Sequence, residues 1–84
     1  MEPPAADDKI TVTPLREMRL PLGGQQLELQ QVEYRHGGIR LLRIRLREGR
    51  RFTVIDIDPL SARQWGEAMS DWARRQPAQG HGTT

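Results

Sequence analysis

The chain has 84 residues, of which 36% are hydrophobic and 29% charged, and its mean hydropathy is −0.71. A single domain of this size buries only about 60% of the surface of its unfolded chain, so dimerisation would add useful burial. The absence of cysteine excludes a disulfide framework, a thiolate nucleophile and a cysteine zinc site.

The two ends of the chain have compositions typical of disorder, and we expect one domain at residues 10–76. Residues 1–9 form a leader of prolines, alanines and aspartates, and residues 77–84 form a tail without a large apolar side chain. The leader lacks the basic and apolar regions of a signal peptide, and no apolar run approaches the roughly 20 residues of a membrane span. We therefore expect a soluble, cytoplasmic protein that makes no contact with membranes.

Most of the domain alternates apolar and polar residues with the two-residue period of β-strands. The first predicted strand, residues 10–22, contains Pro14 and Pro21. Because proline cannot donate a hydrogen bond to a ladder, this strand is predicted at a sheet edge. The sequence GGQQ at 23–26 predicts a turn, and a second strand opens with Leu27 and Leu29.

The sequence HGG at 36–38 predicts the next turn, and residues 39–47 form the third predicted strand. A tight hairpin turn at residues 48–49 then leads to a fourth strand at 51–57. In the last three strands the apolar residues change from odd to even numbers or the reverse, which in a regular strand moves them to the opposite face. Bulges, or strands curved enough to bury both faces in turn, would reconcile this pattern, and we expect a strongly bent sheet.

After residue 57 the period changes to that of a helix, because apolar residues recur at Ala62, Trp65, Met69 and Trp72. Two N-caps are possible: Asp58 followed by proline, or Ser61 followed by glutamine three residues later. Trp65 is expected to pack on the sheet. Trp72, with Met69 beside it, is either a dimer anchor or the edge of the same core.

The third predicted strand carries the strongest charge signal. Although the net charge is only +2, seven arginines and a single acid lie between residues 35 and 51. Arg43, Arg45 and Arg47 alternate with apolar residues and share one face, on which they either bind a polyanion backbone or pair with acids of neighbouring strands. Strict alternation places Arg40 on the opposite face, and Arg50 and Arg51 join the row if the hairpin brings them alongside.

Few other residues suggest chemistry. Tyr34 and Phe52 are the only aromatic residues of the predicted sheet; they either stack on bases or lie partly or fully in the core. Asp56 and Asp58 are better explained by an arginine partner and a helix cap than by catalysis. The two histidines lack partners at metal-ligand spacing. We therefore expect a non-enzymatic domain with no cofactor, no catalytic residue and no metal site.

The order of four strands and one helix, with its basic strands and early helix tryptophan, resembles the positive-cofactor-four-like family of single-stranded nucleic-acid-binding proteins. The resemblance covers the segment from LELQQVEYRHGG to the helix sequence ARQWGEAMSDW. It implies a curved sheet, a helix-mediated homodimer, and nucleic acid bound on the basic face of the sheet. Trp65 would match the helix aromatic of the family, and the basic strand positions would be Arg40, Arg43, Arg45, Arg50 and Arg51.

Together these patterns predict an α+β domain: a curved antiparallel meander of about four strands packed by one C-terminal helix. Two functions are open. In the first, the domain binds single-stranded DNA or RNA through Tyr34 and the arginines of the third and fourth strands. In the second, it is a protein-interaction or homodimerising module that contacts its partner through Trp72 and Met69, and its arginines are solvated or paired with acids.

Overall fold

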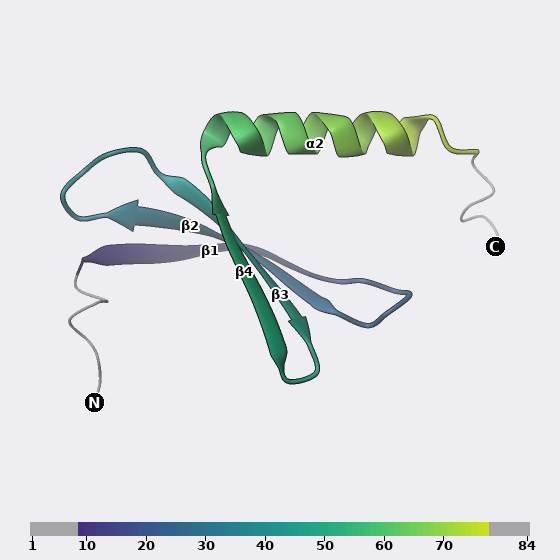
Figure 1. The fold of residues 1–84 in the computed structure, drawn as a ribbon, viewed down its shortest axis with the longest axis horizontal. Coiled ribbons are helices and arrows are strands. Elements are labelled where there is room, and N and C mark those ends of the chain that lie inside the picture. The colour runs from purple at the N-terminus through teal and green to yellow at the C-terminus, as the bar shows by residue number, and fades with distance from the viewer. Residues whose placement is uncertain (1–8, 78–84) are drawn as a thin grey trace.

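A computed structural model describes residues 9–77, so residues 1–8 and 78–84 of the predicted leader and tail lie outside the described part. The described residues form four strands in the sheet order β1-β2-β3-β4, each pair antiparallel, followed by one helix (Figure 1). The predicted α+β fold class, an open meander with a C-terminal helix, is confirmed. The elements are β1 (Ile10–Arg19), β2 (Gln26–Tyr34), β3 (Leu41–Glu48), β4 (Arg51–Ile57) and α2 (Pro59–Arg74).

The strand boundaries follow from the turn residues. β4 has the predicted bounds, but the hairpin loop before it is Gly49–Arg50, one residue later than predicted. Gly49 has a φ of 62° and Arg50 has a negative φ, which is the type II′ pattern with glycine first. β3 begins two residues later than predicted, because the left-handed Gly37 and Gly38 are followed by a short irregular segment before pairing starts.

The change of apolar phase along the strands does not come from bulges in β2, β3 or β4, and it places apolar residues on both faces of the sheet. The pairing register is continuous through these three strands, and the only irregularity lies in β1, between Pro14 and Arg16. Because directly paired residues share a face, Val32 and Leu41 lie on the same side as Arg43. We call the other side the apolar face; it carries Met18, Leu27, Leu29, Leu42, Ile44, Leu46, Ile55 and Ile57.

The start of α2 is set by Asp58, which confirms the first of the two predicted caps. Its carboxylate accepts hydrogen bonds from the Ser61 backbone N–H at 3.2 Å and from the Ser61 hydroxyl at 2.6 Å, and proline follows at the first helical position. These bonds, with that of the hydroxyl largest, hold the pKa of Asp58 below its usual value. The cap therefore fixes the point at which the chain leaves β4.

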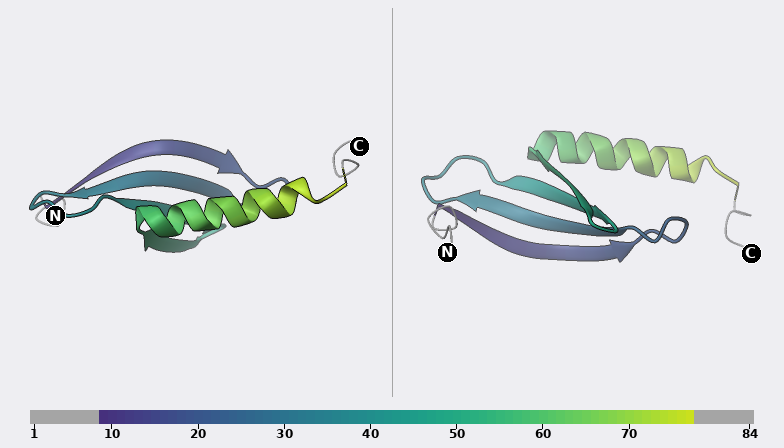
Figure 2. Two further views of the ribbon diagram at one scale, coloured as in Figure 1. Left: turned by 90° about the horizontal axis from the view of Figure 1, so that it is seen from above. Right: turned by 60° about the horizontal axis from the view of Figure 1, so that its bottom comes forward.

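Beyond its first turn, α2 stands away from the sheet (Figures 1 and 2). Its contacts with the sheet are made by that first turn, where Pro59 and Ala62 lie near Leu42 at the beginning of β3. No residue of α2 is buried, and the side chain of Trp65 is 43% exposed. The expected packing of Trp65 on the sheet is therefore not found within one chain.

The single chain consequently has almost no core. Among the described residues only Val32 and Ile57 are buried. The radius of gyration is 16.1 Å, whereas a compact 84-residue domain has about 12 Å. Strand pairing thus determines the shape of the chain, and side-chain packing contributes little to it.

We predict that Asp58→Ala lowers the melting temperature by several degrees at neutral pH, because the first turn of α2 loses its cap. Since the folded-state pKa of Asp58 is lowered, its contribution is present at neutral pH and is lost as the pH falls through that pKa. Circular dichroism melts should therefore converge with those of the wild type in acid. Asp71→Ala, which removes only an exposed ion pair with Arg74, is the control and should change little. Equal effects of the two variants would contradict the assignment.

Candidate nucleic-acid interface

The three arginines predicted to share a face do so. Arg43, Arg45 and Arg47 alternate along β3 and lie opposite the apolar face, where β2 and β4 flank them. We call this side the arginine face. The register pairs Arg43 with Gln30 and Asp56, Arg45 with Glu28 and Val54, and Arg47 with Gln26 and Phe52. Each arginine therefore has a different neighbourhood, and these neighbourhoods decide which guanidinium groups are available to a ligand.

Arg43 is occupied by an ion pair with Asp56. Its Nε and Nη2 donate to the two carboxylate oxygens at 2.8 and 3.0 Å, and both side chains are about a quarter exposed. The bidentate hydrogen bond raises the pKa of Arg43 and lowers that of Asp56, against the opposing effect of partial burial. These two hydrogen bonds occupy the planar guanidinium group of Arg43, which could otherwise bind a phosphate through the same donors.

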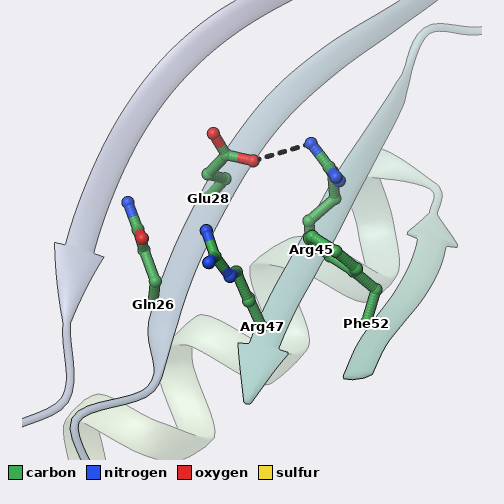
Figure 3. A pocket seen from close by; sticks show the side chains of 5 residues that line it. All are labelled: Gln26, Glu28, Arg45, Arg47 and Phe52. Atoms are coloured by element: carbon green, nitrogen blue, oxygen red, sulfur yellow. Dashed lines mark hydrogen bonds and ion pairs between the residues drawn. The ribbon is translucent and has the colours of Figure 1, made fainter. Parts of the chain in front are cut away.

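Arg45 is also paired, whereas Arg47 is not. Arg45 Nη1 donates to Glu28 at 2.9 Å, and its guanidinium lies 4.9 Å from the centroid of the Phe52 ring (Figure 3). Arg47 lies 5.9 Å from the same centroid, and its Nε donates to the Gly49 carbonyl at 3.2 Å. Within residues 9–77 no carboxylate pairs with Arg47, so its charge is uncompensated.

A fourth arginine, which the sequence analysis did not include, belongs to this face. Arg19 of β1 pairs with Gln26 of β2, and Gln26 pairs with Arg47 of β3, so the three side chains form one row across three strands. Arg19 donates to the Gly24 carbonyl at 3.3 Å and has no carboxylate partner among the described residues. Only the register between β1 and β3 reveals this row, and local sequence patterns carry no signal for it.

The remaining predicted arginines lie elsewhere. Arg40 donates to Glu33 at 3.0 Å, and Glu33 is on the side of the apolar face, as strict alternation predicts for Arg40. Arg51 pairs in register with Glu48, also on that side, and Arg50 is in the hairpin loop. The hairpin does not bring Arg51 beside the predicted row.

Both sheet aromatics lie on the arginine face and are exposed. Phe52 is 53% exposed and Tyr34 is 45% exposed, so of the two alternatives for Phe52 a place in the core is not found within one chain. The two rings lie at opposite ends of the face, because Phe52 pairs with Arg47 and Tyr34 lies beyond Val32 at the far end of β2. Around Phe52 is a hollow of about 160 Å³, lined by Gln26, Glu28, Arg45, Arg47 and Phe52 (Figure 3).

The predicted interface residues of the helix are also exposed. Met69 is 62% and Trp72 is 61% exposed, and they continue the helical spacing from Trp65. We call these three residues the α2 stripe. The described part of the chain thus has two separate candidate surfaces, one cationic with exposed aromatics and one apolar.

Other site types find no support in the described residues. Within residues 9–77, no group of three or more metal-ligating side chains gathers, and no helix is long and apolar enough to span a membrane. Asp56 and Asp58 do not form a carboxylate pair, because the first binds Arg43 and the second caps α2.

The fold and its surfaces define a class of small domain: an open antiparallel meander followed by a helix that stands apart from it. Residues 9–75 match the model of DUF6967, a family of unknown function. The chain belongs to this family. No curated protein and no solved structure matches the chain, and the resemblance to the positive-cofactor-four-like family stays a prediction.

We predict that Arg43 and Asp56 are energetically coupled. In a double-mutant cycle with Arg43→Gln and Asp56→Asn, the coupling in the free energy of unfolding should be about 0.5–1 kcal/mol, since the pair is bidentate but partly exposed. The lowered pKa of Asp56 means that the coupling is present at neutral pH and is lost as the pH falls through that value. Additive effects at neutral pH would show that Arg43 is not committed to this pair.

Proposed function

We propose that the domain is a homodimeric interaction module, in which a second copy covers the apolar face and the α2 stripe. The observation that carries the proposal is the lack of a core in the single chain, where only Val32 and Ile57 are buried among the described residues. A standard interface buries about 800 Å² of each partner, and the exposed apolar side chains of the described residues offer surface of this kind.

Many large apolar side chains of the described residues are exposed. Complete burial of one such side chain stabilises a fold by about 1.5–3 kcal/mol, so covering several of them provides a large driving force for association. Tryptophan and methionine are also enriched at the centres of interfaces. The exposed large apolar residues of the helix are Leu60, Trp65, Met69 and Trp72, and those of the apolar face and β1 include Leu15, Met18 and Ile55.

A second copy of the chain can cover the apolar face and the α2 stripe at the same time. A two-fold axis brings the same patch of each subunit together, so the α2 stripe of one copy can cover the apolar face of the other, and the reverse. The two surfaces therefore need no additional partner. The ion pairs of Arg43 and Arg45 agree with this proposal, because they neutralise two of the three cations on β3 within the chain.

We predict that the wild-type protein sediments as a dimer at micromolar concentrations and that Trp72→Ala shifts it towards monomer by at least tenfold in the dissociation constant. Truncation of a hot-spot residue, a class in which tryptophan is enriched, weakens binding by about 2 kcal/mol or more, which is about thirtyfold. Leu22→Ala is the matched control, because Leu22 is fully exposed in the β1–β2 loop and away from the α2 stripe. A wild-type monomer at all concentrations would contradict the proposal.

A second candidate function is the binding of single-stranded nucleic acid on the arginine face. It is supported by Phe52, which is exposed beside Arg45 and Arg47, since proteins bind single strands by combining cations with aromatic platforms for bases. Arg19 and Arg47 supply uncompensated charge near this ring. The acids that occupy Arg43 and Arg45 weaken the case, because they reduce the positive charge of the face.

If this second function holds, a labelled oligonucleotide should bind at low salt with an affinity that falls steeply as salt increases. Arg47→Gln should weaken binding across all sequences and reduce the slope of log K against log salt by about one. Charge reversal at Arg43 or Arg45 should also weaken binding. Arg63→Gln, on the exposed surface of α2, is the control. Absence of binding at low salt would remove this candidate and leave the dimer proposal intact.

A further inference from the structure

The open sheet has two edges, formed by β1 and β4, and they differ in how they are protected. An edge strand presents unpaired N–H and C=O groups that can pair with another chain, and proteins block such edges with proline, bulges or charged residues. In β1, Pro14 lies in the middle of the strand and the register shifts between Pro14 and Arg16. The β1 edge is therefore protected against pairing.

β4 contains neither a proline nor a bulge. Its seven residues contain no proline or glycine and pair with β3 in an unbroken register. Most of them belong to the β-branched and aromatic types that favour strands: Phe52, Thr53, Val54, Ile55 and Ile57. In residues 9–77 no strand pairs with its outer side, and α2 makes its sheet contacts with β3. The outer edge of β4 is thus regular and open, and its two charged residues are Arg51, next to the hairpin loop, and Asp56, which is paired with Arg43.

The hairpin geometry shows which backbone groups this edge offers. In a two-residue type II′ hairpin the residues that flank the loop, Glu48 and Arg51, form a hydrogen-bonded pair directed inward. Because the direction of the N–H and C=O groups alternates along an antiparallel strand, those of Phe52, Val54 and Asp56 point outward. Three residues therefore present both a donor and an acceptor to an incoming strand.

We infer that the β4 strands of two copies pair antiparallel across a two-fold axis and join the two sheets into one of eight strands. This inference rests on the proposed homodimer and names the edge at which it forms. The register that uses all seven residues is centred on Val54 and sets Phe52 opposite Asp56 and Thr53 opposite Ile55. In this register no like charges face each other. The outward N–H and C=O groups of each strand face the outward C=O and N–H groups of the other.

The position of α2 agrees with a second copy at this edge. α2 follows β4 directly and, beyond its first turn, stands away from its own sheet (Figures 1 and 2), so it is available to a second copy paired at this edge. Ile55, 42% exposed on the apolar face, would gain neighbours from the added sheet. The α2 stripe of each copy would then lie over the sheet of the other, so one arrangement provides cover for both apolar surfaces.

The sharpest test is Val54→Pro, with Val54→Ala as its matched control. The N–H of Val54 points outward, so proline removes a bond to the second copy and none to β3, whereas alanine keeps the N–H and removes a comparable side-chain volume. Sedimentation should show Val54→Pro as a monomer, weakened at least tenfold in dimer dissociation constant relative to Val54→Ala. Far-ultraviolet circular dichroism should show that the strand content is retained. A dimeric Val54→Pro protein would overturn the inference.

Hydrogen exchange of the wild-type protein gives an independent test, which also applies if Val54→Pro fails to fold. At concentrations where the protein is dimeric, the amides of Phe52, Val54 and Asp56 should exchange at least tenfold more slowly than exposed amides. Dilution to monomer should remove this protection. A dimer in which these amides exchange freely would overturn the edge inference and leave the homodimer standing, whereas a wild-type monomer would overturn the homodimer itself.

Discussion

The fold depends on the burial of apolar surface, and one chain does not achieve it. Ordering a residue costs about 1–2 kcal/mol of backbone conformational entropy, which folded domains offset mainly by removing apolar groups from water. In residues 9–77 the sheet is well paired, but only two side chains are buried and α2 stands apart from the strands. The tryptophans of α2 and the apolar face of the sheet thus provide the free energy that association can use.

The arginines of β3 offer less free positive charge than the sequence of that strand alone suggests. Two of the three arginines on β3 bind acids from the adjacent strands, and these cross-strand pairs stabilise the meander while lowering the charge of the face. The uncompensated charge lies at the end of the face, in the row that Arg19 and Arg47 form across Gln26. A polyanion would therefore meet Phe52 and these two arginines first, so any nucleic-acid binding would be centred there.

Local features of the sequence were sufficient to predict most of the fold. The period of two predicted the strands, the glycines predicted the turns, Pro14 predicted an edge strand, and Asp58 with Pro59 predicted the start of the helix. What could not be predicted depends on pairing between distant residues. The row of Arg19 with Arg47 requires the register of three strands. The exposure of Trp65 depends on where α2 lies relative to the sheet, and that of Phe52 on the face to which the register assigns it. The period of a helix identifies its apolar stripe but not the chain that covers it.

Coupling of the folding of this domain to the association of two copies is tested most directly by thermal unfolding at different protein concentrations. If two copies unfold together, the midpoint depends on mass action and should rise by several degrees over a hundredfold increase in concentration. We expect this rise, with a reversible transition at each concentration. A midpoint that is constant over the same range would contradict it, because a chain that folds alone has a concentration-independent stability.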